Sequence, residues 1–362
     1  MATPRRLLVD PAEPGIFHCH SRCVRRAYLC GWDALTGRNY EHRRQWVQRR
    51  IKELAQAFAV DIYAYAVMTN HVHLVVGTDP ARVADWVDCE VARRWLLLFP
   101  GPGGKRGEAP EEAAILALSK NPGRLASCRQ RLADVSWFMR CLNEPIARRA
   151  NREDECTGRF WEGRFKCQRL EDAGALVTCM AYVDLNPVRA GMAAAPETSD
   201  FTSIQERIVA HRARRGLAEI DVAAPPTPPT GPQKVLLESA HAEATRDAWL
   251  VSFDSSDGLK AKPDFALNGL AGLLEVDYFK LLDWTGREIR TGKRGFISED
   301  VRPVLEQLDL DVTAWAENVA RYGSLFHRLA GKVSRLRAWA EAKGQAWLHG
   351  HRGARILYSK TA

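Results

Sequence analysis

The sequence YAYAVMTNHVHLVV at residues 63–76 has the pattern of a β-strand, a tight turn and a second β-strand. β-Branched and aromatic residues, which favour strands, flank a short polar turn over residues 68–70. Because side chains alternate across a strand, His71 and His73 should point to one face of the sheet and Val72 and Leu74 to the other. The two imidazoles would project together with their Cα atoms about 7 Å apart, close enough to share one metal ion. Such a pair can also be half-solvated and bind nothing, so residues elsewhere in the chain must decide.

The segments before this hairpin predict a strand and a helix. Residues 15–21 look like an opening strand, entered through a turn that contains Pro11 and Pro14. From Tyr40 to Ala59 the apolar residues recur at three- and four-residue spacing, which is the pattern of an amphipathic helix packed on a sheet. The basic residues expected on the remaining surface of that helix are Arg43, Arg44, Arg49, Arg50 and Lys52.

His18, His20 and Cys23 in and after the first strand could suggest a zinc site. We reject that interpretation because no second Cys/His pair follows at zinc-finger spacing, and because thiols do not favour a hard ion that activates phosphates. His18 and His20 are expected instead on a sheet face near the site of His71 and His73.

The overall composition is that of a globular protein. The 362 residues are enough for two domains or for one large domain with additions, with 46% hydrophobic and 27% charged residues. We find no apolar run long enough to span a bilayer, and the basic start of the chain lacks the apolar core of a signal peptide. The sequence therefore predicts a cytoplasmic, nucleoid-associated protein.

The charge indicates the type of partner, and the cysteines indicate the redox state of the thiols. A formal charge of +8 favours a polyanionic partner, with nucleic acid as the first candidate, although a basic surface can also have no partner. The nine cysteines are confined to the first half of the chain and include no CxxC pair. Reduced, mostly buried thiols are expected.

Two stretches combine basic residues in ways that suit nucleic acid. Residues 21–26 form a basic turn that could hold phosphates. Residues 158–167 alternate as in a strand and interleave aromatic with basic side chains, so that bases could stack on rings while cations follow the backbone. Core packing is the alternative for Phe160 and Phe165. The candidate DNA-binding residues in these stretches are Arg22, Arg25, Arg26, Arg159, Trp161, Arg164 and Lys166.

Residues 171–191 predict a helix with two polar side chains on one face. Leu176, Cys179 and Met180 belong to a buried stripe at helical spacing. Tyr182 lies about 200° around the helix axis from Met180, so it points away from that stripe. Asn186 follows Tyr182 by one turn and shares its face, although an Asn before a proline is also a good N-cap for a following turn.

The other segments look like additions to these elements. Residues 80–130 are expected to be an insertion between core elements. A proline-rich linker is expected at residues 213–235, followed by a mainly helical C-terminal region at 236–362 that could help to bind DNA. Within that region, residues 285–295 are basic and glycine-spaced, and they fit either a loop that contacts the DNA backbone or a plain solvated loop.

Four of these motifs together resemble the single-tyrosine HUH transposases, in particular the REP-associated tyrosine transposases of bacteria. The motifs are Ser21–Arg26, Met68–His73, Gly158–Trp161 and Tyr182–Gly191. The resemblance covers residues 14–210 apart from the insertion. It implies an α+β fold for residues 1–212, the HUH domain, with a ferredoxin-like or RRM-like antiparallel sheet and helices on one face.

The resemblance also implies a site and a reaction. In this family two histidines and a polar residue one turn after the tyrosine hold Mg²⁺ or Mn²⁺, which matches His71, His73 and Asn186. The family's nucleophile matches Tyr182, and Arg189 in the same motif joins the candidate DNA-binding residues. Relatives often have Gln at the third ligand position, and Asn shortens the reach by one methylene. The implied partner of a monomer or homodimer is single-stranded or hairpin DNA like a repetitive extragenic palindrome.

The chemistry of these residue types agrees with strand cleavage and rejoining. A tyrosine hydroxyl has a pKa of about 10 and is a weak nucleophile unless the phosphate is made more electrophilic. A divalent ion could do this, and a covalent phosphotyrosine would conserve the bond energy for rejoining. One alternative is a domesticated protein that binds repeat DNA with little cleavage. Another is a His-x-His hydrolase of small phosphoesters, against which the lack of further acidic or histidine ligands counts.

Overall fold

The computed structural model of the chain describes residues 8–24, 28–34, 36–101, 103–223, 231–253, 270, 273–291, 301–345 and 350–358. The elements up to residue 170 are β1 (Gly15–Arg22), β2 (Trp32–Asp33), β3 (Arg38–Asn39), α1 (Arg43–Ala57), β4 (Val60–Val67), β5 (His71–Thr78), α2 (Pro80–Ala84), α3 (Asp88–Leu98), α4 (Glu112–Ser119), α5 (Pro122–Leu132), α6 (Val135–Glu153) and β6 (Lys166–Leu170). The later elements are α7 (Ala173–Asp184), α8 (Asn186–Arg189), the 3₁₀ helix η2 (Pro196–Thr198), α9 (Ser203–Ala223), α10 (Gly231–Ala244), α11 (Glu275–Thr291), α12 (Arg302–Gln307), α13 (Trp315–Leu325), β7 (Leu329–Ala330), α14 (Val333–Ala342) and α15 (His351–Leu357).

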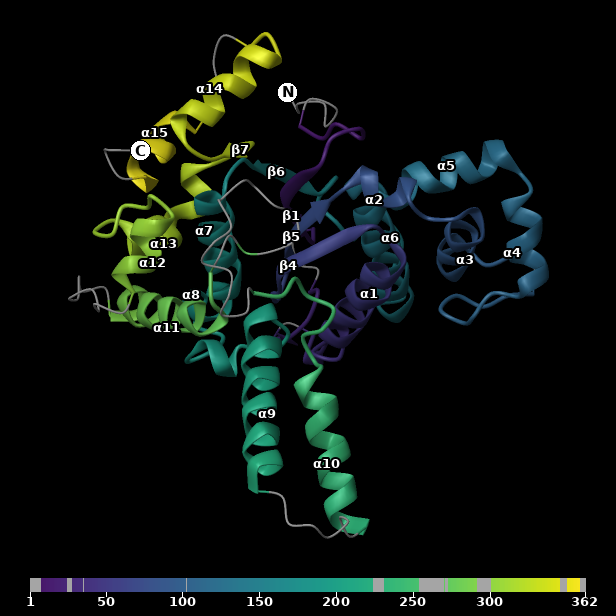
Figure 1. Ribbon diagram of the computed structural model, residues 1–362, viewed down its shortest axis with the longest axis horizontal. Helices are drawn as coiled ribbons and strands as arrows, with labels where there is room; N and C mark the ends of the chain where they lie inside the picture. Colours follow the sequence, from purple (N-terminus) through teal and green to yellow (C-terminus); the bar gives the residue numbers. More distant parts are fainter. Residues whose placement is uncertain are drawn as a thin grey trace.

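The predicted hairpin is confirmed and lies within the main sheet. β4 and β5 pair antiparallel, and the Met68 N–H donates to the carbonyl of His71 at 2.8 Å to close the turn. The sheet has the strand order β4-β5-β1-β6-β7, antiparallel throughout except that β7 runs parallel to β6 (Figure 1). The connections from β1 to β4 and from β5 to β6 each join parallel strands with one strand between them. This is the arrangement of two split βαβ units, and the α+β class follows from it.

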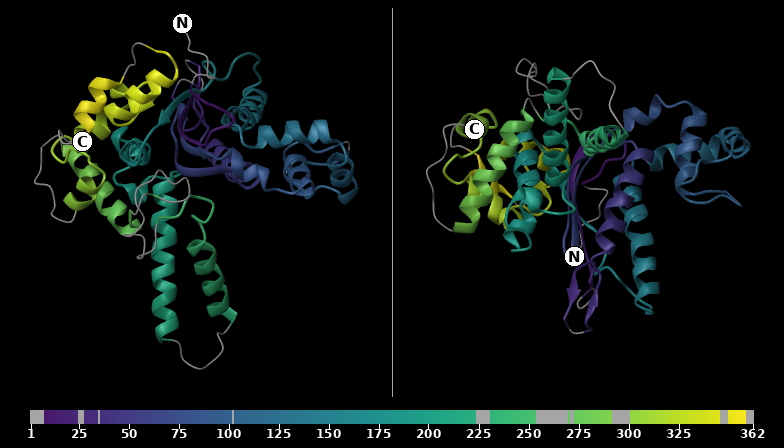
Figure 2. Two further views of the ribbon diagram at one scale, coloured as in Figure 1. Left: turned by 45° about the horizontal axis from the view of Figure 1, so that its top comes forward. Right: turned by 90° about the horizontal axis from the view of Figure 1, so that it is seen from below.

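Helices cover both faces of the sheet, so the expectation of helices on one face is wrong. Phe17, Cys19 and Leu74 point to the face packed by α1 and α6. Ile16 and Val75 point to the opposite face, which packs against α7 and C-terminal helices (Figures 1 and 2). The second layer exists because α7 is apolar all round, not along one stripe, and such a helix must be covered on every side.

The C-terminal region shares this second core. β7 lengthens the sheet, with the Arg169 N–H donating to the carbonyl of Arg328 at 2.7 Å. The Tyr278 hydroxyl of α11 donates to Asp184 of α7 at 2.7 Å. Trp315 of α13 is fully buried in the same cluster of apolar side chains. Residues 273–358 therefore complete the covering of α7.

Three further expectations meet a different structure. Residues 158–165 are not a strand: β6 begins at Lys166, and the loop before it is held by one bridge between Cys23 and Trp161. The predicted linker at 213–235 is helical where it is described, because α9 runs to Ala223 and α10 begins at Gly231, whereas residues 224–230 lie outside the described residues. The expected loop at 285–295 is helical to Thr291, and residues 292–295 lie outside the description.

The segment that was expected to be an insertion is helical, and the cysteines form no disulfides. α2 to α5 lie between β5 and α6 in the chain and form a lobe beside α1 and α6 (Figure 1). The nine cysteines carry thiols, as expected, and most of them are buried. Within the described ranges, none of the helices combines the length and apolarity that crossing a bilayer requires.

Candidate active site in a histidine-lined cavity

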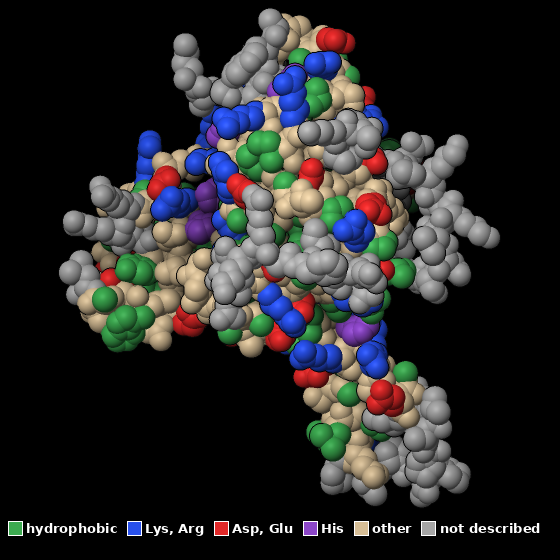
Figure 3. Space-filling model, turned by 90° about the vertical axis from the view of Figure 1, so that its left-hand side faces the viewer, with side chains coloured by type: hydrophobic (Ala, Val, Ile, Leu, Met, Phe, Trp, Pro, Cys, Tyr) green, Lys and Arg blue, Asp and Glu red, His purple; other side chains and the backbone are tan. Residues whose placement is uncertain are grey.

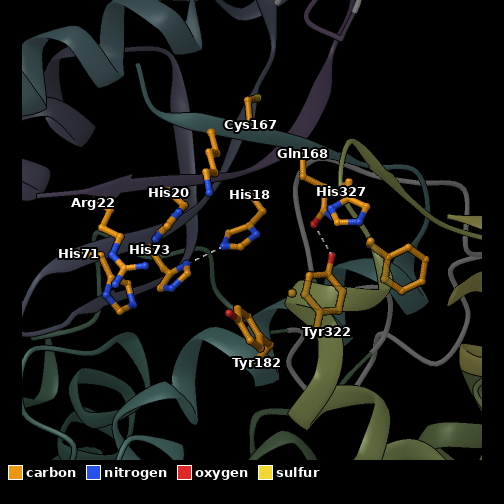
Figure 4. A pocket seen from close by; sticks show the side chains of 13 residues that line it. His18, His20, Arg22, His71, His73, Cys167, Gln168, Tyr182, Tyr322 and His327 are labelled. Atoms are coloured by element: carbon orange, nitrogen blue, oxygen red, sulfur yellow. Dashed lines mark hydrogen bonds between the residues drawn. The ribbon is translucent and has the colours of Figure 1, made fainter. Parts of the chain in front are cut away.

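The register of the strands brings four imidazoles to one face of the sheet. His71 and His73 come from β5, and His18 and His20 come from β1. His20 lies directly opposite His73, and His18 lies opposite Val75. Residues opposite one another in an antiparallel pair share a face, so the four rings point into the same space (Figure 4).

Three of these rings could act together on one ion. The ring centroid of His20 lies 4.5 Å from that of His73 and 5.2 Å from that of His71, and the latter two are 4.8 Å apart. One potential ligand atom from each ring lies within 4.8 Å of the other two. No carboxylate or thiol of the described residues belongs to this group. We call His20, His71 and His73 the three-histidine cluster.

Burial keeps the cluster neutral. The pKa of His71 is lowered to about 4, first by burial and then by the charge of Arg22. The pKa of His20 is lowered to about 3 by burial and by the neighbouring His71 and His18, and the pKa of His73 lies well below its usual value for similar reasons. A neutral imidazole has a lone pair that a metal ion can use. The cluster can therefore bind a cation at neutral pH without first losing protons.

Two neighbours hold the rings of the β5 histidines. Nδ1 of His71 lies 2.7 Å from Oδ1 of Asn70, an acceptor, so Nδ1 carries the proton and Nε2 keeps its lone pair. Nδ1 of His73 lies 2.8 Å from Nε2 of His18. Hydrogen bonds of this kind fix the orientation of metal-binding histidines. Asn70 and His18 are thus positioning residues for the cluster.

Tyr182 stands beside the imidazoles. Of the residues of α7, Tyr182 and Ala173 alone are not buried. The Tyr182 ring lies edge-on to His73, with ring centroids 5.5 Å apart, and edge-on to His18 at 6.0 Å. A helix that is otherwise buried all round therefore presents its one partly exposed ring to the three-histidine cluster and its neighbour.

Helix α13 forms the C-terminal wall of the cavity. The Tyr322 ring lies 5.3 Å from the Tyr182 ring, and the Tyr322 hydroxyl donates to Oε1 of Gln168 at 2.7 Å. A Cβ at Gly323 would lie 3.1 Å from the Tyr182 hydroxyl oxygen, so the absence of a side chain lets the helix approach. The cavity between the strands, α7 and α13 has a volume of about 340 Å³ (Figure 4).

Some of the predicted DNA-binding residues lie at this cavity. Arg22 and Lys166 line it, and both are exposed. In the space-filling view, histidine side chains reach the surface next to Lys and Arg side chains (Figure 3). Arg159 and Arg164 are exposed on the loop before β6 but are not lining residues. Arg25 and Arg26 lie outside the described residues.

Two other candidates have partners within the protein. The Trp161 indole is half-buried and donates to the carbonyl of Asn143 at 2.9 Å. The Arg189 guanidinium lies over the Tyr182 ring, 4.7 Å from its centroid, and donates to the carbonyl of Ala320 at 2.6 Å. Arg189 thus holds the tyrosine and links α8 to α13.

Asn186 is not brought to the cavity. It is buried at the start of α8, its backbone carbonyl accepts from Ala190, and it is not among the lining residues. His20 occupies the place beside His71 and His73 instead. The His18-x-His20 pattern on a strand was a usable signal, since the same alternation that places His71 and His73 places these two. Gln168 and Tyr322 gave no signal in the sequence.

The residues present fit a divalent metal ion. Three neutral imidazoles at this spacing are a donor set for Mn²⁺, Zn²⁺ or related transition ions. Mg²⁺ prefers oxygen ligands, and the cluster supplies none from its own side chains. The expectation of a divalent metal is thus compatible with the site, with Mn²⁺ the better fit of the two ions expected.

The fold and the site define an α+β protein with a histidine-lined cavity beside a tyrosine. No family model matches the chain, and no curated protein matches it. Among solved structures the chain is similar to one described as a REP-associated tyrosine transposase bound to a REP hairpin. The match covers 57% of this chain and 86% of that one, with 12% identity and a TM-score of 0.34.

Proposed function

We propose that this chain is a DNA strand transferase of the single-tyrosine HUH type, with Tyr182 as the nucleophile. The observation that supports this best is the contact of the Tyr182 ring with His73 and His18 in a cavity lined by Arg22 and Lys166. A phenol, neutral metal-binding groups and two cations in one cavity are the groups that phosphodiester transfer requires.

In the proposed reaction the phenolic oxygen of Tyr182 bonds to phosphorus while the bond from phosphorus to the 3′ oxygen breaks. The phenol loses its proton and the leaving oxygen gains one, so the step yields a 5′-phosphotyrosine and a free 3′-hydroxyl with no net proton change. Because the new ester conserves the energy of the phosphodiester, a 3′-hydroxyl of another end can reverse the attack. Joining therefore needs no ATP.

The residues around Tyr182 have distinct roles in this proposal. A divalent ion held by His20, His71 and His73 would polarise the phosphate and align it. Arg22 and Lys166 would neutralise the phosphate charge at the mouth of the cavity. The fixed guanidinium of Arg189 would hold the phenol in place. We keep Asn186 as the weaker candidate for the third ligand.

The proposed partner is single-stranded or hairpin DNA like a repetitive extragenic palindrome, bound in the cytoplasm by a monomer or homodimer. Labelled hairpin DNA incubated with the protein and Mn²⁺ tests the proposal. We expect an adduct that survives SDS and is lost in Tyr182→Phe. An adduct of equal yield in Tyr182→Phe, or turnover of small phosphoesters without any adduct, would contradict it.

One observation favours the second candidate, a protein that binds such DNA with little cleavage. Tyr322 packs on Tyr182, and α13 passes close to the phenolic oxygen at Gly323. A phosphate can reach that oxygen only if it enters from the side of the imidazoles. In this case hairpin DNA is bound but uncut, with the same affinity for wild type and for Tyr182→Phe.

A further inference from the structure

A second basic surface lies on the opposite side of the sheet from the histidine-lined cavity. α1 and α6 pack side by side there, with α3 next to them (Figure 1). Two adjoining hollows between these helices have volumes of about 330 and 500 Å³. The arginine surface, as we call it, consists of the arginines that line the two hollows: Arg49, Arg50, Arg106, Arg140, Arg148 and Arg149.

The positive charge of this surface is not balanced. In the described part of the chain, two carboxylates line the same hollows, those of Glu53 and Glu144. Each is shared between two arginines of the surface. Six arginines against two glutamates leave four positive charges, and neither Arg106 nor Arg149 pairs with a carboxylate among the described residues. Such a patch attracts a polyanion.

Tryptophan rings contact two of these guanidinium groups. The Arg149 guanidinium lies over the Trp46 ring, 3.7 Å from its centroid, and that of Arg140 lies 5.0 Å from the centroid of Trp137. A guanidinium stacked by its face keeps its N–H edges free for an anion and loses less entropy on binding. The Arg148 side chain is 75% exposed although it pairs with Glu144.

A chain of contacts connects the arginine surface to the cavity around the edge of the sheet. Arg22, which lines the cavity, pairs with Glu162 at 3.7 Å. The neighbouring Trp161 donates to the carbonyl of Asn143 on α6. Asn143 precedes Glu144, which lines the arginine surface. The exposed Arg159 and Arg164 lie on the same loop, between the two sites along this chain of contacts.

We propose that the arginine surface binds the phosphodiester backbone of the DNA arm that lies outside the histidine-lined cavity. The choice of DNA as the partner rests on the proposed function. The four surplus positive charges, and the exposed arginines on the loop between the two sites, suit a long polyanion that is bound at both, as a DNA strand would be. Contacts of this type read no sequence and fix the path of the strand.

Binding of labelled single strands to Tyr182→Phe protein tests this proposal without cleavage. One strand has about 10 nucleotides, enough for the cavity, and another has about 30. The test variant adds Arg106→Gln, Arg148→Gln and Arg149→Gln. The matched control adds Arg215→Gln, Arg287→Gln and Arg302→Gln, which are exposed helix arginines that line neither the cavity nor the arginine surface. Arg50 is left intact because it is buried and donates to the carbonyl of Cys141.

We expect the test variant to bind the longer strand about tenfold or more weakly, with a salt slope reduced by about 2, while the short strand is unaffected. Equal loss in the control variant, no loss in the test variant, or equal binding of polyglutamate would overturn the proposal. The two proposals fail separately. If the test variant binds DNA more weakly but wild-type protein forms no adduct, only the proposed function is contradicted. If wild-type protein forms the adduct but the test variant binds DNA as tightly as its parent, only the proposal for the arginine surface is contradicted.

Discussion

At the scale of single residues, His20 and Asn186 are the two candidates for the third ligand of the proposed metal site. His20 lies opposite His73 in the sheet and within the three-histidine cluster, whereas Asn186 is buried away from the cavity. We therefore predict that His20→Ala weakens Mn²⁺ or Co²⁺ binding by more than about 100-fold, and Asn186→Ala by much less. Isothermal titration of the metal into chelator-treated protein measures both.

His18→Ala is the intermediate case, since His18 contacts His73 and is not itself in the cluster. An effect of about 10- to 100-fold is expected for a residue that orients a ligand. If Asn186→Ala weakens metal binding more than His20→Ala does, the third ligand is Asn186, as the family resemblance implies.

The buried imidazoles also make stability depend on pH. Burial lowers the pKa of His18 from 6.5 to about 4. Between pH 6.5 and about pH 4, His18 is protonated in the unfolded chain but neutral in the folded chain. The free energy of unfolding of metal-free protein must therefore fall as the pH falls through this window. His18→Gln should remove at most about 3 kcal/mol of that fall.

Urea unfolding at several pH values measures this effect. His241→Gln on the exposed part of α10 is the control for the loss of one histidine elsewhere in the chain. If His18→Gln shows the same fall as wild type, burial does not keep that ring neutral.

At the scale of elements, the packing of α13 against α7 sets the position of Tyr182, the proposed nucleophile. A Cβ at Gly323 would lie 3.1 Å from the Tyr182 hydroxyl oxygen, whereas one at Gly216 in α9 would meet nothing within 4 Å. Gly216→Ala should gain about 0.5–1 kcal/mol from helix propensity. We predict that Gly323→Ala increases the free energy of unfolding by less than Gly216→Ala does. It should also slow adduct formation about tenfold, because the phenol of Tyr182 must shift.

Thermal unfolding and the rate of adduct formation, measured side by side, check this prediction. Metal binding should be unchanged in both variants, which separates displacement of Tyr182 from damage to the cluster. A Gly323→Ala protein that forms the adduct at the wild-type rate would show that the phenol is not confined by α13.

The elements that sequence could predict are those with local patterns. Alternation and a polar turn were enough for the hairpin, and for the face that His71 and His73 share. The loop at 158–165 alternates too, yet it pairs with the chain next to β1 only through the bridge between Cys23 and Trp161, and the Trp161 indole bonds to α6. Arg43 and Arg50, expected on the solvent side of α1, are buried: Arg43 pairs with Glu153 and Asp154, and Arg50 bonds to Cys141. Tertiary partners distant in sequence decided these cases.

At the scale of the whole molecule, the C-terminal region could not be placed from sequence. Its helices show ordinary amphipathic patterns, which say that one face is buried but not against what. One indication lies in the sequence of α7, which is apolar all round. Such a helix must pack against further elements as well as against the sheet. Through that cover, Tyr322 reaches both Tyr182 and Gln168, so part of the candidate site is supplied from more than a hundred residues away.

This arrangement predicts that the first 223 residues do not form an independent domain. Without residues 224–362, β6 loses its partner β7, and α7 exposes side chains such as Met180 that now pack in a shared core with Leu281 and Trp315. Exposing several large apolar side chains costs about 1.5–3 kcal/mol each, more than a domain's usual stability can supply.

A fragment of residues 1–223 should therefore bind a hydrophobic dye and show no cooperative urea transition. The same fragment co-expressed with residues 231–362 should recover one transition and the metal site. If the fragment unfolds cooperatively on its own, at the same urea midpoint as the full chain, the two regions are separate domains.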